Sequence, residues 1–161
     1  MKLFVLPVLA ACLACSCATG PTYTDAENAG ALEPKKEKGM VVIYNPPGSA
    51  PMGTKYTVYA NNGLVTDSLK RGSFITYDVD PGQLRLSSTG GSGNGLVDVL
   101  KSGPLSLADQ KTDRLTLTVT KGQAYCVEVI PGVWHESLEL KPWNEAEPDI
   151  RNCVWLNPAE R

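Results

Sequence analysis

Residues 114–130, with the sequence RLTLTVTKGQAYCVEVI, carry the clearest structural pattern in this chain. Apolar and polar side chains alternate before and after Lys121-Gly122, and a period of two is typical of β-strands with one buried face. The Lys-Gly pair predicts a tight turn between two strands. The inward faces are then Leu115, Leu117 and Val119 in the first strand, and Tyr125, Val127 and Val129 in the second.

Comparable short segments occur on both sides of this pair, separated by turn signals rich in Gly, Pro and Asn. They are residues 40–45, 55–60, 64–69, 74–79, 83–88, 133–140 and 153–156. This pattern predicts an all-β fold, an immunoglobulin-like antiparallel β-sandwich of about seven to nine short strands. No segment shows a convincing helical spacing of apolar residues, although residues 96–107 allow a short helix or an irregular insertion.

The N-terminus has the pattern of an export signal. Lys2 precedes the apolar run LFVLPVLAACLA (residues 3–14), which is too short to cross a hydrocarbon core of about 30 Å but has the length of a secretory h-region. The small residues and cysteines near its end resemble a bacterial lipoprotein signal, in which a cysteine is acylated. We expect lipidation of Cys17, with Cys12 and then Cys15 as alternatives; a plain signal peptide without lipid is the competing interpretation.

The expected organisation has three parts. Residues 1–16 are the lipoprotein signal peptide, residues 17–38 a flexible tether and residues 39–161 the β-sandwich domain. The tether is poor in large apolar residues and would reach roughly 25 Å as a flexible chain. Acyl chains predict membrane attachment without a spanning helix. No candidate cysteine is followed by Asp, which favours the outer membrane under the rule that holds in enteric bacteria.

Several short motifs occur in a characteristic order: VVIYNP (41–46), YTVY (56–59), GSF (72–74), VDPGQ (79–83), LTL (115–117) and KGQAY (121–125). This order resembles the bacterial lipoprotein family known as domain of unknown function 2846, over residues 39–130. The resemblance implies a small envelope β-sandwich similar to PEGA-type carbohydrate-associated modules. Since no activity is established for that family, it implies no catalytic residue.

His135 is the only histidine, so any Ser-His-Asp site or histidine-based metal site would have to be built around it. In a strand, Trp134 and Glu136 share one face and His135 points to the other, which disfavours a His–Glu dyad. A periplasmic hydrolase centred on His135 is the alternative function, without a GxSxG motif to support it. The acidic run at residues 145–149 predicts a surface loop, and the glycines of residues 90–95 predict a flexible loop.

Three tryptophans allow a second alternative, a glycan- or peptidoglycan-binding surface on which sugar rings stack. Trp134 and Trp155 lie in strand-like contexts, which favours core packing for both. Trp143, between Pro142 and Asn144, is expected to be the most exposed. The candidate ligand-binding residues are therefore Trp143 and Trp134.

Cys126 and Cys153 are the cysteines of the predicted domain. An exported protein enters an oxidising compartment, where a pair of cysteines is expected to be bridged. We therefore expect a disulfide, which would close a loop of about 28 residues and contribute about 3.5 kcal/mol. The competing interpretation is two separately buried small apolar side chains.

The composition limits the possible functions. Fifteen Lys and Arg against seventeen Asp and Glu give a net charge of −2, which removes the electrostatic reason to expect nucleic-acid binding. The sequence predicts a lipid-anchored, periplasm-facing lipoprotein that acts as a non-enzymatic binding or structural module. Its expected partners are the membrane, through the acyl chains, and envelope proteins or peptidoglycan; no cofactor or metal is expected.

Overall fold

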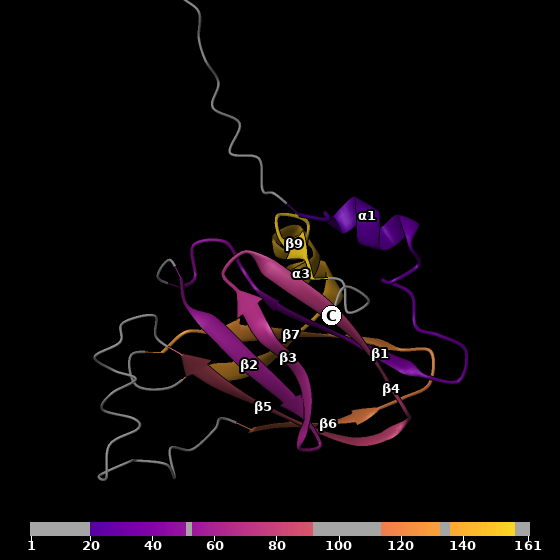
Figure 1. Cartoon of the computed structure of the whole chain (residues 1–161). Coiled ribbons are helices and arrows are strands. Elements are labelled where there is room, and N and C mark those ends of the chain that lie inside the picture. The colour runs from indigo at the N-terminus through magenta and orange to yellow at the C-terminus, as the bar shows by residue number, and fades with distance from the viewer. Residues whose placement is uncertain (1–19, 51–52, 92–113, 133–135, 157–161) are drawn as a thin grey trace, which may run out of the picture.

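The structure, a computed structural model, describes residues 20–50, 53–91, 114–132 and 136–156 (Figure 1). It confirms the prediction of a β-sandwich, because two sheets pack face to face around a shared core. The strands are β1 (Gly39–Asn45), β2 (Lys55–Ala60), β3 (Gly63–Lys70), β4 (Ser73–Val79), β5 (Gly82–Gly91), β6 (Arg114–Val119), β7 (Ala124–Ile130), β8 (Ser137–Lys141) and β9 (Val154–Trp155). Two short helices accompany them in the described residues, α1 (Tyr23–Asn28) and α3 (Trp143–Ile150).

One sheet has the strand order β8-β7-β1-β4-β9, and the other has the order β3-β2-β5-β6. The four-stranded sheet is antiparallel throughout. In the five-stranded sheet β1 runs parallel to β7, and β4 parallel to β9, so the prediction of a purely antiparallel sandwich is wrong there. The reason lies where β1 and β7 begin: Gly122 N–H donates to Lys38 O at 2.8 Å, so both strands enter the sheet side by side from the same end.

The core between the sheets contains the faces that alternation predicts. Leu117, Val119, Val127 and Val129 are buried in it, and Leu115 and Tyr125 pack against it partly buried. Side chains of β1, β2 and β5 complete this core, among them Ile43, Val58, Leu84 and Leu86.

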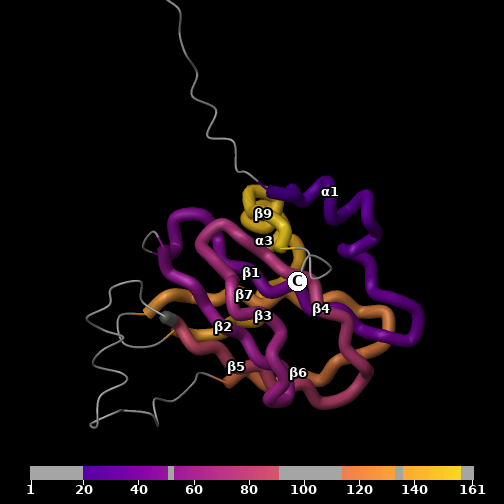
Figure 2. The backbone as a smooth tube through the Cα atoms, in the orientation of Figure 1, coloured from indigo at the N-terminus to yellow at the C-terminus, as the bar shows by residue number. Residues whose placement is uncertain are grey.

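Strand β1 is buried on both faces along its whole length. Val41 and Ile43 point into the core between the sheets, whereas Met40, Val42 and Tyr44 belong to a second core on the other face. Helices α1 and α3 and strand β9 contribute Tyr23, Ala26, Ala146, Ile150 and Trp155 to that second core. The molecule therefore has three layers, with α1, α3 and β9 gathered at one end and β5 and β6 at the other (Figures 1 and 2).

The prediction of a flexible tether is wrong for the described part of residues 17–38. Helix α1 begins with a capping box, in which Asp25 N–H donates to Thr22 Oγ1 at 3.4 Å and Thr22 N–H donates to Asp25 Oδ2 at 2.6 Å. Tyr23 is 6% exposed and Ala26 is fully buried. Farther along, Lys35 pairs with Asp78 at 2.6 Å, Lys38 with Asp80 at 3.4 Å, and Glu37 with Lys121.

The acidic run at residues 145–149 is also helical rather than a surface loop. It forms most of α3, which buries Ala146 and Ile150 against the sheet and leaves Glu145 and Asp149 exposed. Two apolar residues one turn apart are enough to pack a helix of this length against the sheet, because they lie on the same face of the helix.

Candidate functional site

Several candidate residues of the sequence lie outside the described residues. These are the three N-terminal cysteines Cys12, Cys15 and Cys17, the pair Trp134 and His135, and residues 92–95 of the glycine-rich stretch. Gly90 and Gly91 are the last residues of β5.

The two described tryptophans both pack inward. Trp155 is 7% exposed in the second core, as its strand context predicts, and its indole Nε1 has no hydrogen-bond partner among the described residues. Trp143 packs against the same core but is half-buried, so it is the more exposed of these two tryptophans, as the sequence predicts.

Cys126 and Cys153 are both buried free thiols, so the predicted disulfide is not formed in the structure. Cys126 lies beside Val42 of β1, whereas the Cys153 thiol lies 3.7 Å from the backbone oxygen of Asn45. The two thiols therefore lie beside different residues of β1. Burial raises the pKa of each thiol to about 12, so both are neutral apolar side chains at ordinary pH.

A polar cluster joins α1 to α3. Arg151 donates from Nε and from one terminal nitrogen to Glu147 Oε1, at 3.1 and 2.7 Å, and the Tyr23 hydroxyl donates to the same oxygen at 3.3 Å. The Arg151 guanidinium also lies over the Tyr23 ring. The hydrogen bond from Arg151 lowers the pKa of the Glu147 carboxyl, which keeps this cluster charged near neutral pH.

The chain just before α1 is fixed as well. Trp155 N–H donates to Pro21 O at 2.6 Å, and Val154 N–H donates to Gly72 O at 2.8 Å. Pro21, α1, α3 and β9 therefore form one connected unit at one end of the molecule. We call this unit the attachment end.

The outer face of the four-stranded sheet carries a different kind of surface. Cross-strand pairing places Leu64, Tyr59, Ser87 and Arg114 in one row across β3, β2, β5 and β6. Arg85 lies on the same face of β5, two residues from Ser87. Tyr59, Asn62, Arg85, Ser87 and Arg114 line a shallow hollow of about 250 Å³. We call this surface the arginine face.

The hairpin between β2 and β3 fixes the backbone of Arg85. Asn61 and Asn62 have φ values of 48° and 68°, as a tight two-residue hairpin turn with both central residues left-handed requires. Asn61 N–H donates to Arg85 O at 2.8 Å, and Arg85 N–H donates to Asn61 Oδ1 at 2.9 Å. A second hollow of about 220 Å³ adjoins the first and shares Asn62 and Arg85 with it.

Sequence reasoning missed the arginine face. Alternation puts Arg85 and Arg114 on the outward faces of their strands, but only the β5–β6 register, in which Arg85 pairs with Thr116 and Ser87 with Arg114, brings them together. Local sequence patterns predict where the strands and turns lie, but they do not predict which residues of β5 and β6 pair.

Neither a family model nor a curated protein matches this chain. Within the described ranges, no group of three His, Cys, Asp or Glu side chains could hold a metal ion. The helices of the same ranges are all too short or too polar to cross a membrane.

Proposed function

We propose that this protein is a lipid-anchored lipoprotein of the bacterial cell envelope whose β-sandwich acts as a binding module rather than an enzyme. The observation that carries the proposal is the close link between the candidate lipidation site and the folded domain. Residues 18–20 are all that separate Cys17 from Pro21, whose carbonyl already accepts a hydrogen bond from Trp155.

This link defines how an anchored domain would be presented. Four extended residues reach at most about 14 Å, much less than a flexible tether through residue 38 would allow. Acyl chains on Cys17 would therefore hold the attachment end close to the bilayer surface. Strands β5 and β6, which carry Arg85 and Arg114, lie at the other end of the molecule from α1 and β9 (Figure 1), so the arginine face would lie away from that membrane.

The surface chemistry of the described residues favours binding. The arginine face is open and shallow, and it offers guanidinium, amide and hydroxyl groups to a ligand. The hydrolase alternative depends on His135, which lies outside the described residues. The resemblance of the motif order to domain of unknown function 2846, a lipoprotein family without an established activity, is in line with the same proposal.

Metabolic labelling with palmitate, followed by membrane fractionation, tests the anchor. The wild-type chain should be labelled and should sediment with the outer membrane, since acyl chains are its means of attachment. Cys17→Ser should abolish labelling and release the domain into the soluble periplasmic fraction. Cys15→Ser and Cys12→Ser are matched controls that should keep both properties. Labelling that persists in Cys17→Ser moves the anchor to Cys12 or Cys15, and a wild type that is never labelled overturns the proposal.

A further inference from the structure

We propose that the arginine face binds the carboxylate-bearing glycan of the cell wall, with Arg85 and Arg114 holding its acidic groups and Tyr59 supporting its sugar rings. The inference assigns a site and a ligand class to the binding module proposed above, and it rests on that proposal for the location in the envelope and for the orientation at the membrane. Four observations carry it: unpaired charge, spacing, apolar surface and orientation.

The first observation is that both guanidinium groups are exposed and lack an acidic partner among the described residues. Some other described cations do have a close acidic partner, as in Lys35–Asp78, Lys141–Glu139 and Arg151–Glu147. Guanidinium presents a planar fork of donors that matches the two oxygens of a carboxylate. Two such forks in one hollow are complementary to an anionic ligand.

The second observation is the spacing of the two arginines. Arg85 pairs with Thr116 and Arg114 with Ser87, so they are diagonal neighbours on adjacent strands. Side chains in that relation start roughly 7–8 Å apart. Ser87, a small residue, lies beside Arg114 and keeps the floor of the hollow low. This arrangement suits a polymer that carries repeated carboxylates better than a single small anion.

The third observation is an apolar surface beside the charges. Tyr59 is half-buried on the outer face, and Leu64, its cross-strand neighbour, is 57% exposed. An aromatic ring next to amide groups is the usual setting for a sugar, because the ring covers the apolar face of the sugar while amides bond its hydroxyls. Asn62 and Gln83 provide those amides at the two hollows.

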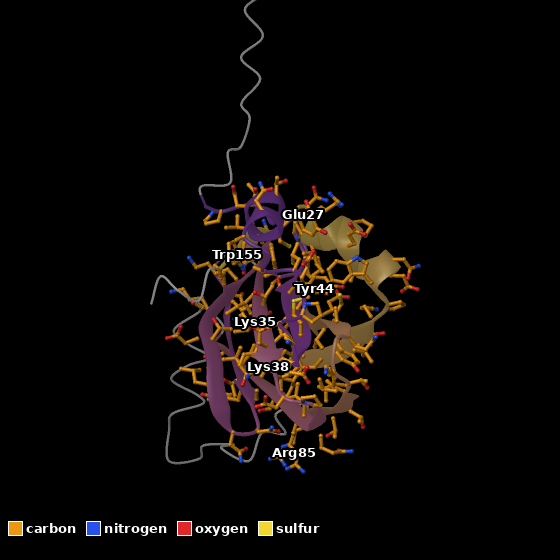
Figure 3. The ribbon with its side chains drawn as sticks, turned by 90° about the vertical axis from the view of Figure 1, so that its right-hand side faces the viewer. Glu27, Lys35, Lys38, Tyr44, Arg85 and Trp155 are labelled. Atoms are coloured by element: carbon orange, nitrogen blue, oxygen red, sulfur yellow. The ribbon has the colours of Figure 1, made fainter. Side chains whose placement is uncertain are left out.

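The fourth observation is orientation, which distinguishes the cell wall from anionic lipid. Figure 3 shows Arg85 at the opposite end of the molecule from Glu27 of α1. With the attachment end held at the membrane, the arginine face is directed at the space where the cell wall lies. Because the Asn61 hydrogen bonds fix the Arg85 backbone, little ordering of the main chain is needed when a ligand binds.

Co-sedimentation of the full chain, purified in detergent, with isolated peptidoglycan sacculi tests the inference. The wild type should sediment with the sacculi, and its binding should weaken as NaCl is raised, because charged contacts are screened. Arg85→Gln and Arg114→Gln should each weaken binding about tenfold, and the double variant should not bind. Lys70→Gln is the matched control: it removes one exposed charge outside the hollow and should bind like the wild type.

Two further arms identify the ligand. Sacculi whose carboxylates have been converted to amides should no longer bind, and Tyr59→Ala should bind more weakly than Tyr59→Phe. The wild type and the double variant should bind equally well to vesicles of anionic phospholipid, because the two arginines are not expected to contact lipid. The inference is overturned if the wild type ignores sacculi, if amidated sacculi bind equally well, or if the arginines matter only for vesicles. Binding by detergent-purified protein does not require an acyl chain. A negative palmitate test would therefore overturn the lipid anchor alone, and a negative sacculus test would overturn the arginine face alone.

Discussion

The guanidinium carbon of Arg151 lies 4.5 Å from the centroid of the Tyr23 ring. Arg151 follows helix α3 near the end of the chain, whereas Tyr23 begins helix α1 near its start. A cation over an aromatic face is attracted by the ring quadrupole. Together with the hydrogen bonds to Glu147, this contact holds α1 against a segment more than 120 residues later in the chain.

Replacing Arg151 should therefore loosen α1 without unfolding the sandwich. In Arg151→Ala, we expect backbone amides of residues 25–29 to exchange with deuterium severalfold faster, because a six-residue helix has little stability of its own. Hydrogen exchange measured by mass spectrometry reports this directly. Amides of β1 serve as the internal control and should keep their protection. Unchanged exchange in α1 would show that Tyr23 burial alone holds the helix.

The two buried thiols should remain chemically free in the exported protein. Alkylation of denatured, unreduced protein should modify both Cys126 and Cys153, because both are free thiols in the structure. The native protein should react slowly at both positions, since burial raises their pKa and limits access. Peptide mass spectrometry counts the modified residues. A linked pair of peptides in the unreduced sample would contradict the structure.

These thiols should also make stability depend on pH in the alkaline range. Burial raises their pKa from the ordinary value of 9.0 to about 12 in the folded protein, so the folded state binds more protons than the unfolded state between these pH values. The free energy of unfolding should then fall as pH rises from about 9 to about 12, by about 1.4 kcal/mol per pH unit for each thiol.

Urea unfolding at pH 8 and at pH 10 measures this effect. Cys126→Ala and Cys153→Ala should each reduce the loss of stability between the two pH values, because alanine does not titrate. Tyr44, whose pKa is also raised, is present in every variant, and burial, Glu128 and Asp149 raise its pKa more than the two thiols do, so most of its contribution cancels from this difference. Equal pH slopes in all variants would contradict the assignment to the thiols.

Gly39, the first residue of β1, should not tolerate a side chain. A Cβ added there would overlap the Val119 side chain and lie 3.0 Å from Thr120 O. Gly39→Ala should lower the free energy of unfolding by about 1–3 kcal/mol, as overpacking does in other cores. Denaturant titration of Gly39→Ala, Val119→Ala and the double variant tests the cause. The double variant should lose less than the sum of the single losses; strict additivity would point to a different origin.

The strands could be predicted from sequence because the pattern of apolar and polar residues in each strand reflects which of its faces are buried. Lys55–Ala60 is bounded in the structure as its pattern indicates, and the inward residues of β6 and β7 are those that alternation selects. The unbroken apolar run at residues 41–44 reflects burial on both faces, which is typical of a central strand with parallel pairing. Such patterns predict a strand even when its partner strand is unknown.

The helices were missed because their stability comes from elsewhere in the fold. Helix α1 does carry local signals, Thr22 and Asp25 as a capping box and Gly30 at φ 65° after its end, but its buried side chains are only Tyr23 and Ala26. Helix α3 contains Pro148, which argues against a helix when considered alone. Packing on the sheet stabilises α1 despite its few buried side chains and α3 despite Pro148. The local sequence does not indicate that packing.

The parallel pairing of β1 and β7 has a consequence for how the chain folds. Val42 pairs with Thr76 on one side and with Cys126 on the other, 84 residues later. Strand β1 therefore lacks its second neighbour until residues 124–130 are available for pairing. Until then VVIY offers an open edge of the kind that recruits other chains. The edge of β1 is therefore protected from aggregation only after β7, which ends at Ile130, has paired with it.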